Sequence, residues 1–170
     1  MPSRPISCHT FFYREYAHFQ FLMHEFFPAF AGFSPAEKID LRIWSAGCSS
    51  GQEAYTLAMC LAKAIQEENI GRDRFVLPVI LSTDISRKKL EEARHGIFKK
   101  EDILKLPAEM QSEYFQAVED DPRKYRVSPE IREMVIFKRL NLNGDEFPFK
   151  KKFNIIPGVY FKQHWRESYR

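Results

Sequence analysis

The chain has 170 residues, enough for one domain built around one hydrophobic core. Hydrophobic residues make up 44% and charged residues 29%, as in ordinary globular proteins, and sixteen phenylalanines predict an aromatic-rich core. The net charge of +3 is too small to indicate a nucleic-acid-binding protein, and we expect no nucleic-acid partner.

No apolar run reaches the ~20 residues of a membrane-spanning helix, and the N-terminus lacks the apolar core of a signal peptide. We therefore expect a cytoplasmic protein without membrane insertion. Cys8, Cys48 and Cys60 form neither a metal-ligand spacing nor an even disulfide set, so we expect reduced thiols and no metal site. The sequence leaves the oligomeric state open.

Hydrophobic periodicity predicts helices and strands that alternate along the chain. In chain order the predicted elements are an irregular segment (1–13), an amphipathic helix (14–30), a buried strand (41–47), a helix (53–69), a strand (75–86), a helix (86–96), short helices (within 100–117), a candidate short strand (125–127), a helix start (128–130), a strand (134–142), a turn (143–145) and the beginning of a fourth main strand (153–156). This alternation predicts an α/β fold with a mostly parallel sheet. Such sheets usually have ~5–6 strands, so we expect a fold truncated after its fourth main strand.

A glycine loop follows the first predicted strand. Residues 47–51 read GCSSG, which fits the G-x-S-x-G pattern of a serine hydrolase with Ser49 as the nucleophile. Only His95 and His164 follow it, and the loop comes after the first strand rather than after several, which makes this the weaker interpretation. The phosphate-binding P-loop motif is absent, because no lysine follows Gly51 directly. The dinucleotide fingerprint is absent as well, because no further glycine lies between Gly47 and Gly51.

The loop instead suits a small cofactor without phosphates. It lies at the carboxyl end of a strand, where ligands bind in open α/β sheets, and Gly47 and Gly51 leave its backbone accessible. The second strand ends at Asp84, whose carboxylate can accept hydrogen bonds from both hydroxyls of a ribose. The third strand ends in Asn141 and Leu142, which suit an adenine edge. An adenosine without phosphates that carries an amino acid describes S-adenosylmethionine.

Polar residues near the loop fit the amino acid end of that cofactor. Glu53 can accept from the ammonium group, and Arg14 or the free N–H groups of the following helix can bind the carboxylate. Each residue also has a structural alternative: Glu53 completes an S-x-x-E capping box with Ser50, Asp84 is an ordinary acid near a helix, Asn141 is a turn residue, and Arg14 is a surface charge.

Six blocks along the chain resemble the CheR-type chemotaxis receptor methyltransferases. The blocks, in family order over roughly residues 8–156, are HTFFYREYAHFQFL (9–22), LRIWSAGCSSGQEAYTLAM (41–59), ILSTDISRKKLEEARHGIF (80–98), LPAEMQSEYF (106–115), YRVSPEIREMVIFKRLNL (125–142) and FPFKKKFNII (147–156). The resemblance implies a Rossmann-like class I methyltransferase core and a protein-glutamate O-methyltransferase activity. It also implies S-adenosylmethionine as cofactor, S-adenosylhomocysteine as product, and methyl-accepting chemotaxis receptors as partners.

The resemblance assigns cofactor roles residue by residue. The family's T-x-F-F-R block and the strand-end residues match Thr10, Arg14, Glu53, Asp84, Asn141 and Leu142, beside the glycines Gly47 and Gly51 of the loop. The family often has an asparagine two places before the threonine, where this chain has Cys8.

The chain also departs from the family. After residues 153–156 the family's Arg-Asn pair is missing, so we assign no catalytic residue. We expect the preceding helical subdomain, the later strands and the small β subdomain that grips receptors to be absent. We divide the chain into an N-terminal linker and helix (1–35), a partial S-adenosylmethionine-binding core (36–156) and a divergent tail (157–170). The alternative is a non-catalytic fragment that binds the cofactor or another protein.

Overall fold

The structure is a computed structural model that describes residues 10–14, 16–143 and 147–157. The predictions for the irregular start (1–9), for the end of the turn after Asn143 and for the tail beyond residue 157 lie outside the described residues.

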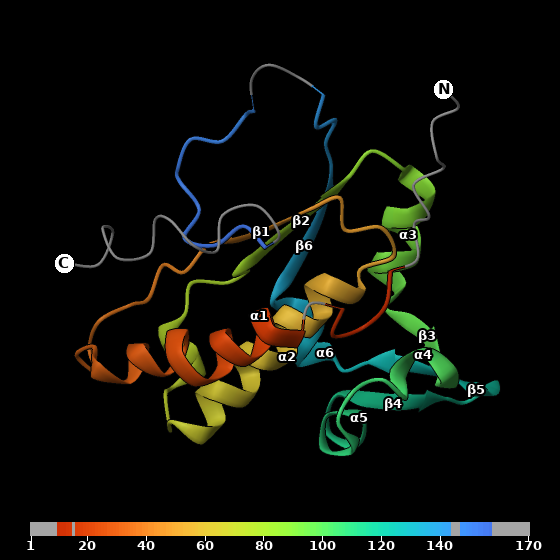
Figure 1. Cartoon of the computed structure of the whole chain (residues 1–170), viewed down its shortest axis with the longest axis horizontal. Helices are drawn as coiled ribbons and strands as arrows, with labels where there is room; N and C mark the ends of the chain where they lie inside the picture. Colours follow the sequence, from red (N-terminus) through yellow and green to blue (C-terminus); the bar gives the residue numbers. More distant parts are fainter. Residues whose placement is uncertain (1–9, 15, 144–146, 158–170) are drawn as a thin grey trace.

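A parallel sheet with the strand order β1-β2-β6 forms the centre of the fold (Figure 1). Its strands are β1 (Ile43–Ala46), β2 (Ile80–Asp84) and β6 (Val135–Arg139). The register pairs Ala46 with Thr83 and Asp84 with Arg139, so the three strands end at one edge. The parallel α/β core predicted from the alternating pattern is therefore confirmed.

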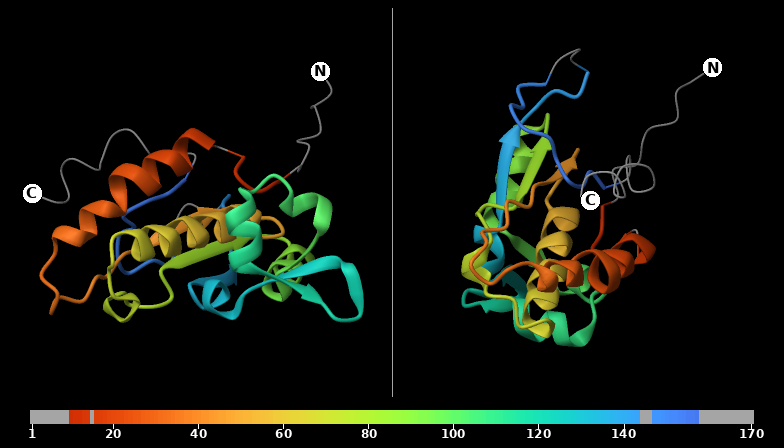
Figure 2. Two further views of the ribbon diagram at one scale, coloured as in Figure 1. Left: turned by 90° about the horizontal axis from the view of Figure 1, so that it is seen from below. Right: turned by 90° about the vertical axis from the view of Figure 1, so that its left-hand side faces the viewer.

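Helix α2 (Gln52–Glu67) packs against β2 and β6, and the N-terminal helical stretch lies on the outer side of α2 (Figure 2). Burial explains this arrangement, since eleven of the sixteen residues of α2 are buried between these two neighbours. Helix α3 (Arg87–His95) packs against β2 and β6. It begins at Ser86, whose side chain accepts a hydrogen bond from the Lys89 N–H, and it ends at Gly96 in the left-handed region, as the sequence predicts.

The predicted amphipathic helix over 14–30 is helical but not one regular α-helix. It consists of α1 (Tyr16–Phe21), a π-helical turn η1 (Leu22–Phe26) and a 3-10 turn η2 (Pro28–Gly32). The N–H of Phe27 donates to the carbonyl oxygen of Leu22, five residues earlier, which is the π-helical pattern. The predicted apolar face is confirmed as buried core: Phe19, Leu22, Met23, Phe26, Phe27 and Phe30.

A second, antiparallel sheet with the order β3-β5-β4 lies between β2 and β6 in the sequence (Figure 1). Its strands are β3 (Ile97–Lys99), β4 (Phe115–Val118) and β5 (Asp121–Val127). The remaining helical elements of the described chain are η3 (Arg72–Arg74), α4 (Lys100–Ile103), α5 (Ala108–Tyr114) and α6 (Pro129–Glu133). The expectation that the chain lacks a small β subdomain is therefore wrong. The sequence pointed only to residues 125–127, because most of β5 is exposed and shows no alternation of apolar residues.

Aromatic packing attaches this small sheet to the rest of the fold. The ring of Phe12 packs edge-to-face on Phe98 of β3 and on Phe115 of β4, with ring centroids 4.8 and 5.7 Å apart. Phe98 in turn contacts Tyr55 of α2. The N-terminal segment thus fills the space between α2 and the small sheet, which the isolated pattern of residues 97–127 does not reveal.

The predicted fourth main strand at 153–156 is reduced to a single parallel bridge between Ile43 and Ile155. The N–H of Trp44 donates to the carbonyl oxygen of Ile155 over 2.9 Å, so this segment lies beside β1. The Trp44 ring packs against Phe149 and Phe153. Among the described residues, no helix is long and apolar enough to cross a membrane.

Candidate cofactor site

The loop after β1 lies against the end of β2. The N–H groups of Gly47 and Cys48 both donate to the carbonyl oxygen of Thr83, over 2.8 and 2.9 Å. On the other side of β2, the N–H of Leu140 donates to the carbonyl oxygen of Asp84 over 3.1 Å, immediately before Asn141. The sheet therefore brings together three of the segments in which the sequence predicted cofactor residues.

Asp84 holds the glycine loop in place. Its Oδ2 accepts the Ser49 N–H over 2.8 Å and its Oδ1 accepts the Ser86 N–H over the same distance. A carboxylate has about four acceptor positions, so each oxygen keeps capacity for another donor. The half-buried carboxylate thus orders the loop and keeps acceptor positions for further donors.

Glu53, in the first turn of α2, is oriented from the strand before the loop. Its Oε1 accepts a hydrogen bond of 2.7 Å from Oγ of Ser45, which is fully buried. The capping-box alternative is not observed, because Gly51 is the N-cap without a side-chain cap and Ser50 Oγ donates to Oε1 of Gln52. Sequence reasoning missed Ser45, since a single serine inside a strand carries no local signal.

The two loop glycines differ in what surrounds them. Both have positive φ values, +73° for Gly47 and +92° for Gly51, where side chains are strained. A Cβ at Gly47 meets nothing within 4 Å, which leaves the backbone open to a ligand. A Cβ at Gly51 meets Ala93 Cβ at 3.1 Å and Phe137 Cζ at 3.3 Å, so close packing alone explains this glycine.

Thr10 and Arg14 flank a segment that is attached to α2. Between them, the N–H of Tyr13 donates to Thr56 Oγ1 over 3.4 Å, and Thr56 Oγ1 donates to the carbonyl oxygen of Gln52 over 2.7 Å. The segment therefore lies about one helical turn from the start of α2. Thr10 is half-buried and Arg14 is exposed.

Asn141 and Leu142 follow β6 directly and are both exposed. Oδ1 of Asn141 accepts the N–H of Asn143 over 3.1 Å, which is the turn geometry of the structural alternative. Leu142 is 42% exposed, and its side chain offers an apolar surface at the edge of the sheet where the strands end. The turn and a place beside an adenine are compatible, because the turn uses only one polar atom of Asn141.

The loop provides no activated nucleophile among the described residues. Ser49 has a positive φ of 49°, and its backbone N–H is bonded to Asp84 rather than its hydroxyl being bonded to a histidine. The Cys48 thiol is buried, which raises its pKa to about 12, and the nearby charge of Asp84 contributes to the same shift. Within the described chain, no group of three or more His, Cys, Asp or Glu residues is arranged to hold a metal ion.

Comparison with known families supports the cofactor interpretation. The model of the CheR methyltransferase SAM-binding domain matches residues 8–164. The chain belongs to the CheR methyltransferase family. This membership removes the serine hydrolase interpretation of Ser49. The parallel α/β core is consistent with a methyltransferase of this family.

Chemotaxis methyltransferases are among the relatives of this CheR-family chain. It is 44% identical over 165 residues to the chemotaxis protein methyltransferase of Borreliella burgdorferi, in an alignment that covers 94% of this chain and 56% of the relative. It is 32% identical over 148 residues to the probable chemotaxis protein methyltransferase of Rhizobium etli (86% and 53%) and 30% identical over 159 residues to the chemotaxis protein methyltransferase of Escherichia coli (91% and 51%). The chain spans about half the length of these curated relatives.

Proposed function

We propose that this chain is the S-adenosylmethionine-binding part of a methyltransferase that acts on glutamate side chains of chemotaxis receptors. The observation that carries the proposal is the parallel register, in which Gly47, Asp84 and the residues just before Asn141 share one edge of the sheet. The family membership and the names of the relatives support the same reaction class. The proposal includes a cytoplasmic location and the division of the chain at about residues 35 and 156 given by the sequence.

In this proposal each predicted cofactor residue has one task. Asp84 accepts from the ribose hydroxyls, and Glu53, oriented by Ser45, accepts from the ammonium group. Asn141 and Leu142 lie along the adenine. The other members of the set are Thr10 and Arg14 at the amino acid end, Gly47 under the ligand, and Gly51 at the start of α2.

The chemistry requires positioning rather than proton transfer by this chain. A glutamate side chain has a pKa of ~4.3 and is ionised at neutral pH, so its oxygen needs no general base. When bound, the cofactor supplies an electrophilic methyl group: the carboxylate oxygen forms a bond to the methyl carbon while the carbon–sulfur bond breaks, leaving a methyl ester and S-adenosylhomocysteine. The chain's contribution is to hold the two reacting atoms ~3 Å apart.

We infer that the small antiparallel sheet contacts the receptor. Members of the family use a small β subdomain for this purpose, and β5 exposes Arg123, Lys124 and Arg126 to solvent. Phe98 of this sheet packs against Phe12 and against Tyr55 of α2, and these contacts attach the sheet to the parallel core. A receptor bound to the small sheet is therefore held on the same core that carries the cofactor residues at the edge of the parallel sheet.

Calorimetric titration with S-adenosylhomocysteine and a methylation assay with labelled donor and receptor-containing membranes test the proposal together. Saturable binding and labelled receptor glutamates support the full proposal. Binding without methylation supports the alternative, a non-catalytic cofactor-binding fragment. A chain that is folded by circular dichroism and shows no binding contradicts the cofactor site.

A further inference from the structure

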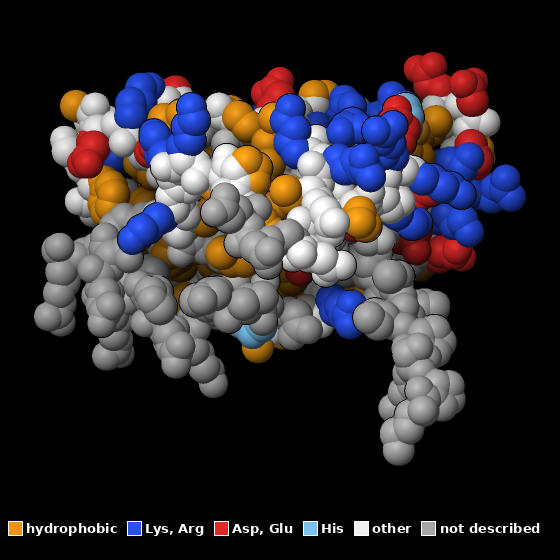
Figure 3. Space-filling model, turned by 90° about the horizontal axis from the view of Figure 1, so that it is seen from above, with side chains coloured by type: hydrophobic (Ala, Val, Ile, Leu, Met, Phe, Trp, Pro, Cys, Tyr) orange, Lys and Arg blue, Asp and Glu red, His pale blue; other side chains and the backbone are white. Residues whose placement is uncertain are grey.

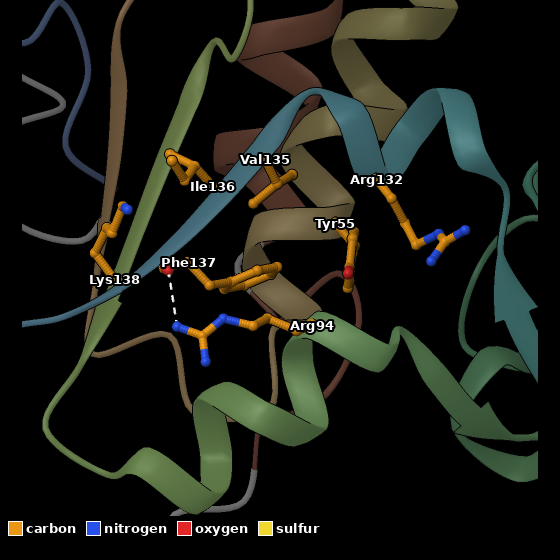
Figure 4. Close-up of a pocket in the computed structure, with 7 residues that line it drawn as sticks. All are labelled: Tyr55, Arg94, Arg132, Val135, Ile136, Phe137 and Lys138. Atoms are coloured by element: carbon orange, nitrogen blue, oxygen red, sulfur yellow. Dashed lines mark hydrogen bonds between the residues drawn. The ribbon is translucent and has the colours of Figure 1, made fainter.

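A groove of about 370 Å³ runs beside β6 (Figure 4). Its walls come from β6, from Tyr55 of α2, from Arg94 of α3 and from Arg132 of α6. None of the residues proposed to bind the cofactor lines this groove. It is therefore a second surface feature that the proposed function leaves without a role.

The groove follows a strand edge that has no neighbouring strand among the described residues. β6 is the last strand of the order β1-β2-β6. The N–H of Ile80 donates to the carbonyl oxygen of Met134, and the N–H of Leu140 donates to that of Asp84, which fixes the alternation of the ladder. The backbone groups of Val135, Phe137 and Arg139 consequently face away from β2.

A side chain occupies one point of this outward row. Nη2 of Arg94 donates to the carbonyl oxygen of Phe137 over 3.1 Å, as the dashed line in Figure 4 shows. A long cation from a neighbouring helix is a typical cover for an exposed strand edge. Because the Arg94 side chain is 48% exposed, it can leave Phe137 without unpacking the core.

The groove is positively charged. Arg94, Arg132 and Lys138 line it, and none of its lining residues is acidic. Arg94 forms an ion pair with Glu91 of the same helix, whose carboxylate lies 3.6 Å from Arg94 Nη1. Nε of Arg132 is buried and has no hydrogen-bond partner among the described residues. A buried donor of this kind is costly unless a partner satisfies it.

The positive surface extends onto the neighbouring helix. Arg87 and Lys88 of α3 are exposed. Figure 3 shows lysine and arginine side chains gathered on the part of the surface that carries α3. Charge of one sign along a groove favours and steers a partner of the opposite charge.

We propose that this groove binds an extended acidic segment of a partner protein, which pairs with the outward row of β6 as an additional strand. Extended peptides recognise free sheet edges through backbone hydrogen bonds, and their alternate side chains meet the two faces of the sheet. Arg94 releases the carbonyl oxygen of Phe137 and pairs with a carboxylate of the segment, while Arg132 and Lys138 bind further carboxylates. The proposal does not depend on cofactor binding or on methyl transfer.

Fluorescence anisotropy with two labelled peptides tests both parts of the proposal on the full chain. The first peptide alternates glutamate and valine over eight residues, and the second replaces each valine by proline, which keeps the charge but removes backbone donors. We expect saturable binding of the first peptide that weakens with salt, and an affinity for the second that is about tenfold lower. Equal affinities contradict strand addition.

Charge variants test the location. The double variant Arg94→Ala/Arg132→Ala is expected to bind the glutamate–valine peptide about tenfold more weakly, and Lys138→Glu, at an exposed position, about threefold more weakly. Lys150→Ala/Lys152→Ala, at two exposed positions in the segment beside β1, removes the same charge as the double variant outside the groove and should leave the affinity unchanged. The proposal is wrong if this control weakens binding as much as the groove variants, or if single-stranded DNA of eight nucleotides binds as tightly as the peptide.

Discussion

Ser45 Oγ donates a hydrogen bond of 2.7 Å to Oε1 of Glu53 and thereby joins β1 to the first turn of α2 across the glycine loop. Ser45 is fully buried, whereas Glu53 is half-buried. A hydrogen bond to a charged acceptor is stronger than one between neutral groups. The bond therefore fixes the direction of the carboxylate that we assign to the cofactor's ammonium group.

Ser45→Ala is expected to weaken binding of S-adenosylhomocysteine by about tenfold, because the loss of a charge-assisted hydrogen bond frees the Glu53 carboxylate to rotate. Calorimetric titration measures the change. Ser82→Ala is the matched control: Ser82 is also fully buried in a strand, but its hydroxyl has no hydrogen-bond partner among the described residues. Unchanged binding by the Ser45 variant contradicts the positioning role.

Asp84→Asn should both destabilise the chain and weaken ligand binding. The substituted amide can accept from only one of the two N–H groups, of Ser49 and Ser86, that the carboxylate now accepts. We expect the free energy of unfolding to fall by about 1–3 kcal/mol in urea denaturation. Asp121→Asn, at a half-buried carboxylate of the β4–β5 hairpin, should leave binding of S-adenosylhomocysteine intact. Equal binding by the Asp84 variant removes the ribose role.

The two loop glycines should respond differently to alanine. Gly51→Ala adds a methyl group 3.1 Å from Ala93 Cβ at a φ of +92°, so we expect a loss of about 2–4 kcal/mol in unfolding free energy. Gly47→Ala meets open space and should cost about 1 kcal/mol from backbone strain alone. Its larger effect should be on binding of S-adenosylhomocysteine, because the methyl group points into the space left for the ligand. Reversed effects on stability contradict the packing described for this loop.

Alkaline pH should destabilise the fold through its buried thiols. Burial raises the pKa of Cys60 to about 12 and that of Cys48 to about 12, whereas unfolded thiols titrate at ~8.5. Above the unfolded pKa the unfolded state loses the proton that the native state keeps. Stability is therefore complete below about pH 8.5, and it declines as the pH rises towards 12, by roughly 1 kcal/mol per pH unit for each thiol.

Urea denaturation at several pH values from about 7.5 to about 10.5 measures this decline. Cys60→Ala should reduce the slope of unfolding free energy against pH, because it removes one of the two titrating thiols. A slope identical to that of the unsubstituted chain shows that the Cys60 thiol does not contribute.

Ser49 should not react with a fluorophosphonate probe. The backbone N–H of Ser49 donates to the Asp84 carboxylate, which holds the residue in the loop. The methyl transfer that we propose for this chain needs no serine nucleophile. Labelling is read by gel fluorescence with a known serine hydrolase as positive control. Labelling that disappears in Ser49→Ala contradicts this expectation.

The sequence predicted those parts of the fold that local patterns determine. The strand that ends at Asp84, the helix between Ser86 and Gly96, and the glycine turn at Gly47 each rest on a short run of residues with a clear pattern. The aspartate and the glycines of the candidate site were accessible for the same reason, since strand ends and glycines are visible without knowledge of the packing.

Features that depend on distant contacts were not predictable. The hydroxyl of Ser45 can orient the Glu53 carboxylate only because the folded glycine loop brings the first turn of α2 back beside β1. The small sheet packs against Phe12, which lies 86 and more residues before Phe98 and Phe115. The π-helical turn at Leu22–Phe26 preserves the apolar face of a regular helix, so periodicity does not distinguish the two.

The excursion of the chain that contains the small sheet begins and ends at a single point. The carbonyl oxygen of Gly96 accepts the N–H of Val127 over 2.9 Å, and both residues lie at the boundary of the antiparallel sheet. Thirty residues therefore lie between the point where the chain leaves the parallel core and the point where it returns to it. Such an insertion can change in length or sequence, or be exchanged between relatives, while the crossover from β2 to β6 keeps its course. Under the function that we propose, the choice of receptor can thus change in this insertion while the cofactor residues on the parallel sheet stay the same.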